Sequence, residues 1–256
     1  AFTALDKYGY VYAWGDVNYG GFDDINLLNL SNIVQIYSTS RGSFAALDTS
    51  GYVYAWGQTW SGGFGGINVT KQVTLSGESY LSDIVQIYST DAAFAALDKQ
   101  GLVYAWGAEW AGGFNSNNDK AKTQATKVSL NRSNDPLHDA SAIENIVQIY
   151  STNQAFAALD KDGYIYVWGD PSFAGFDRTV ARLVTISGED GINDISNIKL
   201  IYNTGSAFAA LSTSDDVYAW GDYNNGGHTS TTVATQLNNK FKMLNNDFIN
   251  YNINIQ

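Results

Sequence analysis

The sequence contains no cysteine, so disulfide bonds and thiol chemistry are excluded and the redox compartment is left open. Lys and Arg number only 14 of 256 residues against 25 Asp and Glu, which gives a net charge of −11. Phosphate backbones are bound by clustered Lys and Arg, so no nucleic-acid partner is expected. No apolar run approaches the roughly 18 residues of a membrane-spanning helix, and no membrane span is expected either.

Methionine is missing from the first position, because the chain opens Ala-Phe-Thr inside a repeated unit, and no signal peptide is visible. We therefore expect a processed product or a piece excised from a longer polypeptide. Lys and Glu are scarce beside abundant Asn, Ser and Thr, which predicts a polar and weakly charged surface. This composition favours an extracellular or surface-associated setting.

One segment recurs five times and organises the rest of the chain. Its clearest copy begins Phe156-Ala-Ala-Leu, continues through Asp160-Lys-Asp-Gly163 and ends Tyr-Ile-Tyr-Val-Trp168. The copies begin at Phe2, Phe44, Phe94, Phe156 and Phe208 and lead to Trp14, Trp56, Trp106, Trp168 and Trp220. Apolar runs around an Asp/Gly turn predict a β-hairpin. We expect the turn Asp to accept local backbone hydrogen bonds, and the turn glycine, or Asp215 in the fifth copy, to have a positive φ.

Both faces of the second hairpin strand are apolar. In the copy Leu102-Val-Tyr-Ala-Trp106, Val103 and Ala105 point to one side, whereas Tyr104 and Trp106 point to the other. A strand that is apolar on both sides is covered on both sides. In an all-β repeat the covers must be further sheets, as in the stacked blades of a propeller.

Two further strands are predicted in each unit. An Ile-x-x-Ile-Tyr strand precedes the hairpin at 33–37, 84–88, 146–150 and 198–202, and a short strand follows it at 73–75, 128–130 and 184–186, with weaker forms at 25–30 and 233–237. Four short strands in a repeat of about fifty residues are typical of a β-propeller blade. We therefore predict a single all-β domain over 1–256, with repeats at about 1–43, 44–93, 94–155, 156–207 and 208–256.

The repeats resemble those of the regulator of chromosome condensation family, in their divergent tandem form. The shared motifs are Ile-Val-Gln-Ile-Tyr-Ser-Thr, Phe-Ala-Ala-Leu-Asp, Gly-Tyr-Val-Tyr-Ala-Trp-Gly and a Gly-Gly turn, and they cover essentially the whole chain. The resemblance implies a propeller that serves as a binding or structural platform. The chain departs from the family where Thr90-Asp-Ala-Ala93 replaces Gly-x-x-His, and in having five copies where the best-known members have seven blades. Nucleotide exchange and chromatin binding belong to particular members, and no residue match transfers them.

The two ends of the chain predict how the ring closes. The first hairpin lacks its Ile-x-x-Ile-Tyr strand, and residues 247–252 match that strand in pattern. We therefore expect a β-propeller of five four-stranded antiparallel blades, closed by the C-terminal strand, which completes the first blade and leaves no long free edge. The alternative is a fragment of a longer array.

Aromatic residues after each Trp-Gly are the candidate ligand-binding residues. They are Tyr19, Trp60, Trp110, Phe173 and Tyr223. In loops at the rim they would stack on sugar rings or hold a protein partner, because Trp and Tyr are enriched in binding hot spots. The alternative role for these side chains is packing between blades.

The sequence shows no recognisable catalytic or metal-binding constellation, so no catalytic residue, metal or cofactor is predicted. Asp16, Asp23 and Asp24 lie close enough in sequence to seat a hard cation, but Asp16 is replaced in the next two copies. His138, in the long insertion of the third copy, has no second imidazole near it. Solvated loops explain both groups.

These observations predict a non-enzymatic recognition or adhesion module that binds a protein or a glycan through its rim loops. A structural subunit of an extracellular or particle-like assembly, in which copies of the chain contact one another, is one alternative. An enzyme with a site in the axial channel is the other, although no copy offers a nucleophile, a base and an electrophile together.

Overall fold

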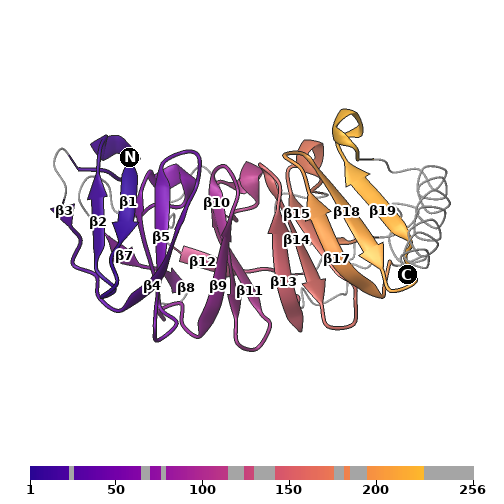
Figure 1. Cartoon of the computed structure of the whole chain (residues 1–256), viewed down its shortest axis with the longest axis horizontal. Coiled ribbons are helices and arrows are strands. Elements are labelled where there is room, and N and C mark those ends of the chain that lie inside the picture. Colours follow the sequence, from indigo (N-terminus) through magenta and orange to yellow (C-terminus); the bar gives the residue numbers. More distant parts are fainter. Residues whose placement is uncertain are drawn as a thin grey trace, which may run out of the picture.

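Five β-sheets follow one another along the chain, each built around one copy of the predicted hairpin (Figure 1). The computed structural model describes residues 1–22, 26–64, 70–75, 79–114, 124–129, 142–175, 182–184 and 195–227. Sheet 1 contains β1 (Phe2–Leu5), β2 (Val11–Trp14) and β3 (Asn26–Leu27), and sheet 2 contains β4 (Ile33–Ser38), β5 (Ser43–Asp48), β6 (Val53–Gly57) and β7 (Lys71–Gln72). Sheet 3 contains β8 (Thr74–Leu75), β9 (Ile84–Ser89), β10 (Ala93–Asp98), β11 (Val103–Gly107) and β12 (Gln124–Lys127). Sheet 4 contains β13 (Ile146–Ser151), β14 (Ala155–Asp160), β15 (Ile165–Gly169) and β16 (Arg182–Leu183), and sheet 5 contains β17 (Ile198–Asn203), β18 (Ala207–Ser212) and β19 (Val217–Gly221).

The hairpin occupies the middle of sheets 2 to 4, as predicted, whereas among the described strands it lies at one edge of sheets 1 and 5. Its first strand pairs antiparallel with the second, and the register places each repeat's Phe opposite its Trp, for example Phe156 opposite Trp168. In sheets 2 to 5 the preceding Ile-x-x-Ile-Tyr strand pairs with the other edge of the hairpin, and we call this strand the inner strand. Gly9, Gly51, Gly101 and Gly163 have φ of +84°, +84°, +81° and +82°, and Asp215 has φ of 65°. The predicted positive φ is therefore confirmed in all five turns.

The turn aspartates act through local hydrogen bonds, again as predicted. Oδ1 of Asp160 accepts the backbone N–H groups of Asp162 and Tyr164 at 2.9 and 2.8 Å. Its other carboxylate oxygen accepts a hydrogen bond from the Tyr166 hydroxyl at 3.1 Å. In sheet 5 the Ser212 hydroxyl oxygen takes the place of the carboxylate. Turn formation thus explains the recurring residue.

The outer strands differ from the prediction in position and in pairing. The strand that pairs with the hairpin is 71–72, 124–127 or 182–183, which precedes the predicted 73–75, 128–130 and 184–186. The predicted Val73, Val128 and Val184 are instead buried, and each donates one backbone hydrogen bond to the hairpin. Thr74–Leu75 leaves its own sheet and pairs in parallel with β12, so sheet 3 has five strands. The unpaired outer edge of β12 accepts this strand, as exposed sheet edges readily do.

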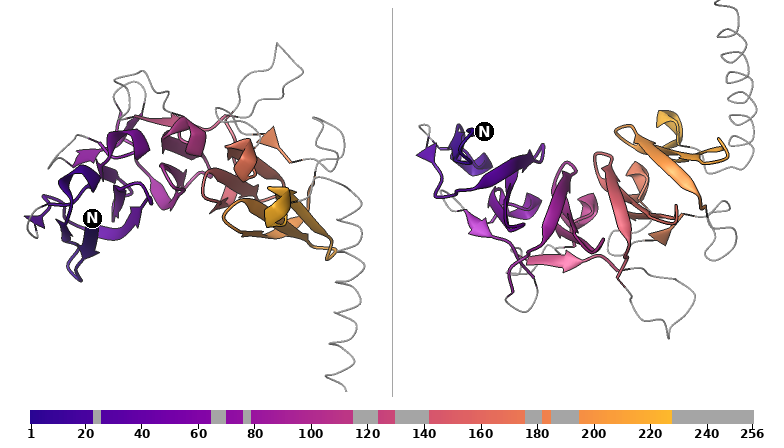
Figure 2. Two further views of the ribbon diagram at one scale, coloured as in Figure 1. Left: turned by 90° about the horizontal axis from the view of Figure 1, so that it is seen from above. Right: turned by 60° about the horizontal axis from the view of Figure 1, so that its bottom comes forward.

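The five sheets form an open arc with sheets 1 and 5 at opposite ends, which differs from the closed ring expected from the sequence (Figures 1 and 2). Within the described residues none of the sheets closes on itself, and sheets 1 and 5 show three strands each where four were expected. The fourth strand expected at 233–237 and the closing strand expected at 247–252 lie outside the described residues. All-β architecture from successive antiparallel blades is therefore observed, while closure stays a prediction.

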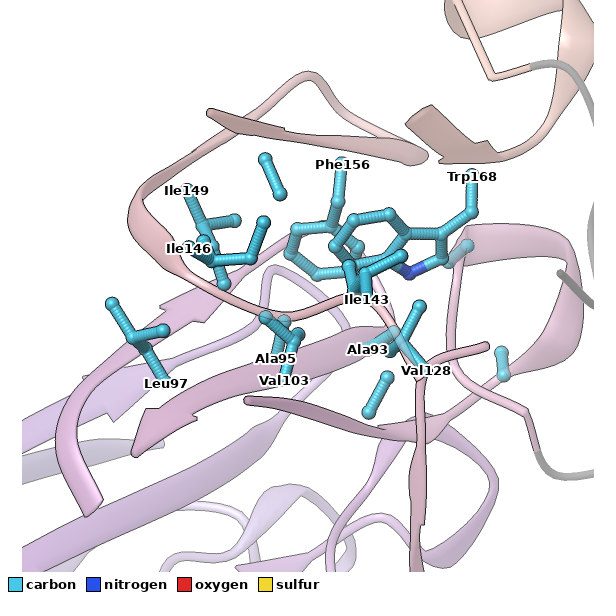
Figure 3. Packing of buried hydrophobic residues seen from close by; sticks show 14 of the residues in the cluster. Ala93, Ala95, Leu97, Val103, Val128, Ile143, Ile146, Ile149, Phe156 and Trp168 are labelled. Carbon is cyan, nitrogen blue, oxygen red and sulfur yellow. The ribbon is translucent and has the colours of Figure 1, made fainter. Parts of the chain in front are cut away.

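The hydrophobic core is divided among the four spaces between consecutive sheets. One face of each hairpin, which we call the aromatic face, carries the Phe and Trp of the repeat, and in sheets 2 to 5 it packs on the preceding sheet. The opposite, aliphatic face carries Ala, Leu and Val, and in sheets 1 to 4 it packs on the following sheet. In Figure 3, Phe156 and Trp168 of sheet 4 lie over Ala93, Val103 and Val128 of sheet 3. The predicted two-sided burial is confirmed for the central sheets.

Candidate functional site

A short 3₁₀ helix follows the second hairpin strand of every sheet and forms a rim along one edge of the arc. The helices are η1 (Val17–Tyr19), η2 (Thr59–Ser61), η3 (Glu109–Ala111), η4 (Pro171–Phe173) and η5 (Tyr223–Asn225). Each of the first four lies against the second hairpin strand of the next sheet. The residue after each helix has a left-handed backbone; it is Ala174 after η4 and a glycine after the other four. After η1, η2 and η3 the glycine is also needed for space, because the Phe of the next sheet lies close to it. A Cβ on Gly112, for example, would lie 2.7 Å from Cδ2 of Phe156.

Hydrogen bonds from buried hydroxyl groups hold the rim helices against the sheets. The threonine of the Ile-Tyr-Ser-Thr motif donates a hydrogen bond to a rim carbonyl, from Thr90 to Ala111 at 2.9 Å and from Thr152 to Phe173 at 2.7 Å. In sheet 2 the Ser43 hydroxyl bonds the Gln58 carbonyl at 2.8 Å. These bonds restrict the rim helices, so side chains carried by them are held in place before any ligand arrives.

The predicted ligand-binding aromatics all lie in these helices, but their exposure differs. Tyr19 and Tyr223 are exposed, and the Trp60 side chain is 38% exposed. Trp110 and Phe173 are partly buried and pack against the cores below them. Some of the five aromatic residues are therefore exposed and others pack against the core, and the role of these residues in ligand binding stays a prediction.

Trp60 and Trp110 form an aromatic pair at the centre of the rim. Their ring centroids are 6.5 Å apart and the ring planes meet at 31°, although the residues belong to consecutive repeats. The contact arises because η2 lies against β11 of sheet 3, and η3 directly follows β11 in the chain. Sequence reasoning selected both residues but did not show that they meet, since the pairing depends on how one repeat stacks on the next.

Asp16, the residue considered for a cation, serves as a helix cap. Its Oδ1 accepts the Asn18 backbone N–H at 2.9 Å, and Asp170 and Asp222 cap η4 and η5 in the same way. Within the described residues, no three His, Cys, Asp or Glu side chains gather as metal ligands would. Asp23, Asp24 and His138 lie outside the part of the chain that the structure describes.

The inner strands carry a second row of side chains that the sequence analysis did not single out. Consecutive inner strands contact one another, and Val34, Val85, Val147 and Leu200 are exposed along them. The signal was present, since the second or third residue of the Ile-x-x-Ile motif is apolar in every copy. A β-bulge at the second residue of the motif, where the pairing register shifts, lets both isoleucines face the core and leaves Val34 and its equivalents exposed.

Tyrosines of the inner strands connect each sheet to the next. Burial raises the pKa of Tyr37, Tyr88 and Tyr150, and the backbone amide of an isoleucine on the following inner strand partly offsets this pKa increase. The amide that faces Tyr88, for instance, belongs to Ile149. These phenols are therefore neutral at physiological pH and act in packing between sheets.

No helix in the described residues is long and apolar enough to cross a lipid bilayer.

Comparison with known proteins identifies structures with a similar fold and does not show an activity. No family model and no curated protein sequence matches the chain. Human WBSCR16 matches in structure with a TM-score of 0.56 and 18% identity, over 89% of this chain and 62% of WBSCR16. Prp20p of Saccharomyces cerevisiae, solved in a study of its binding to Gsp1p and histones, matches with a TM-score of 0.48 and 19% identity, over 86% of this chain and 55% of Prp20p. Yeast RCC1 (Prp20) bound to Kap60 matches with a TM-score of 0.49 and 20% identity, over 85% of this chain and 53% of that one.

The chain thus spans about three fifths or less of the length of these structures. Identities of 18 to 20% show a shared fold and nothing finer. The structural match to WBSCR16, an RCC1-like protein, agrees with the resemblance read from the repeats. We conclude that the chain shares the fold of WBSCR16, as a series of successive β-blades.

Proposed function

We propose that the protein is a non-enzymatic binding module that contacts a protein partner through its rim. The observation that carries this proposal is the pair formed by Trp60 and Trp110, whose rings lie 6.5 Å apart at the centre of the rim. Binding hot spots are enriched in Trp and Tyr, because a large rigid ring buries much area at little cost in conformational entropy. Tyr19 and Tyr223, exposed on the same series of helices, extend the aromatic row in both directions.

The anchoring of the rim supports this role. Thr90 and Thr152 bond the rim carbonyls, and Trp110 packs against the core between sheets 3 and 4. A surface that is already rigid loses little further freedom when a partner binds. A glycan is the alternative ligand for the same surface, since aromatic rings also stack on the apolar faces of sugars.

Capture experiments with three proteins test the proposal. Immobilised wild-type chain, Trp60→Ala and Tyr52→Ala are each exposed to an extract and to a glycan array. Tyr52 is the matched control, because it is an aromatic of similar exposure in sheet 2 but lies in the hairpin turn at the other end of the strands. We expect a protein retained by wild type and Tyr52→Ala and lost by Trp60→Ala. Equal retention of a protein by all three chains would contradict a binding site on the rim. If Trp60→Ala loses binding only on the glycan array, the ligand of the rim is a glycan and not a protein.

A structural subunit of a homomeric assembly is the second candidate function. It is favoured by a separate observation, the uncovered faces of the first and last sheets, which are described next. An extracellular or surface-associated location accords with either candidate and stays a prediction.

A further inference from the structure

The four internal interfaces of the arc are copies of one heterologous contact. In each, the aliphatic face of one sheet receives the Phe and Trp of the next, so the two sides of the contact differ in composition. Phe44, Phe94, Phe156 and Phe208 are at most 7% exposed there. The repeated contact provides a template for what an uncovered face of either kind accepts.

Sheet 1 presents an uncovered aromatic face. Phe2 stacks on Trp14 with ring centroids 5.7 Å apart, in the same arrangement as Phe156 on Trp168 at 5.3 Å. Phe2 is nevertheless 67% exposed, because no described sheet precedes it. An aromatic pair with this geometry is buried in every other repeat, so this one is a half-interface whose other side is not among the described residues.

Sheet 5 presents the complementary half. A Cβ on Gly20, Gly62 or Gly112 would lie 2.9, 2.9 or 2.7 Å from the Phe of the following sheet, whereas a Cβ on Gly226 would have nothing within 4 Å. Ala209, Leu211 and Ala219 of the aliphatic face are partly exposed, although their counterparts in sheets 2 to 4 are buried. Among the described residues, the position that receives a phenylalanine in the other interfaces is therefore open.

We propose that these two faces bind each other between copies of the chain, head to tail, with Phe2 of one copy seated beside Gly226 of the next. The partner is a second copy because this chain carries both halves of the contact at opposite ends of the arc (Figure 2). A heterologous contact that does not close on itself continues into linear assemblies. Sheet 1 supplies the hairpin side of the aromatic face without an inner strand, so the contact is weaker than the internal ones.

Sedimentation equilibrium of the full chain, from roughly 1 to 500 µM, tests the proposal. We expect the average mass to rise with concentration past that of a dimer. Phe2→Glu removes the aromatic half. Gly226→Asn blocks the other half, and it is expected to fold because asparagine enters the left-handed region and the space around Gly226 is open. Each variant weakens association by roughly 30-fold or more, as loss of an interface hot spot does.

Mixing the two variants distinguishes this interface from others. Phe2→Glu keeps an intact sheet 5 face and Gly226→Asn keeps an intact sheet 1 face, so the 1:1 mixture forms a dimer and nothing larger. Tyr8→Glu, which adds the same charge at an exposed aromatic in the first hairpin turn, associates like wild type. If Gly226→Asn fails to fold, Ala209→Glu serves as the variant of the same face.

Three results would overturn the proposal. They are a wild-type chain that stays monomeric throughout, as a ring closed by its own tail would; association abolished by Phe2→Glu but untouched by Gly226→Asn, as in a two-fold dimer; and a mixture that remains monomeric. The rim variant Trp60→Ala leaves association intact, so failure here and failure of the rim proposal are separate outcomes.

Discussion

Replacing the same phenylalanine in two repeats measures how much the stacking of sheets stabilises the fold. Phe156 and Phe2 occupy the same position in the hairpin, opposite Trp168 and Trp14, and both stack on that tryptophan. Phe156 is fully buried against sheet 3, whereas Phe2 is 67% exposed. Phe156→Ala and Phe2→Ala therefore remove the same side chain from the same hairpin position. They differ in the neighbouring sheet and in the inner strand, since β13 pairs with the strand of Phe156 and no described strand pairs with the outer edge of β1.

The structure predicts a large difference between the two variants. A buried Phe→Ala substitution costs about 3–5 kcal/mol, because it loses the transfer free energy of the ring and leaves a cavity. With about a third of its surface covered, Phe2 contributes roughly a third of the 1.5–3 kcal/mol of a fully buried side chain, and no cavity forms. We therefore expect Phe2→Ala to lower the free energy of unfolding by less than about 1 kcal/mol.

Urea unfolding followed by tryptophan fluorescence and by circular dichroism measures both values. The protein must be dilute, so that contact between copies does not cover Phe2. Agreement of the two probes is required before a free energy is assigned, because each sheet contacts only its neighbours and repeat proteins can unfold in parts. Equal losses in the two variants would refute the reasoning, since they would mean that Phe2 is covered or that the space between sheets 3 and 4 is not tightly packed.

Three further predictions concern the turns, the rim and the alkaline limit. Gly112→Ala should destabilise the chain by about 1–3 kcal/mol more than Gly226→Ala in urea unfolding, because both have a left-handed backbone but only Gly112 abuts the next sheet. Asp160→Ala, which leaves two backbone N–H groups without their acceptor, should cost about 1–2 kcal/mol by the same measurement, and an unchanged midpoint would contradict that turn's role. Burial, and then the nearby Asp98, raise the pKa of Tyr104 to about 12 from 10.0. The folded state therefore keeps a proton that the unfolded state releases, so stability is level below pH 10 and falls between pH 10 and 12, and Tyr104→Phe should reduce that fall in urea titrations across this range.

Local features of the fold follow from the sequence because short-range forces determine them. A hairpin forms wherever Asp and a left-handed residue close a turn between two apolar strands, and all five copies show it, with Asp215 in place of glycine in the last. The inner strands are found where the Ile-x-x-Ile-Tyr motif places them. The predicted positions of the outer strands were wrong because Val73 and its equivalents are buried just after the paired residues and are not themselves part of the paired strand. A strand of only two residues has no side-chain periodicity from which its position could be predicted.

By itself, the sequence determined that every hairpin needs a cover on both faces, because apolar residues alternate onto both sides of strands such as Val103–Gly107. It also selected the aromatics of the rim. Only the tertiary structure decided which residues meet across repeats, such as Trp60 with Trp110, and that Thr74–Leu75 joins the neighbouring sheet. It also showed an arc in which no described sheet covers the outer faces of sheets 1 and 5. The physical reason is that side-chain alternation acts within one strand, whereas the angle between successive sheets depends on packing summed over many distant contacts.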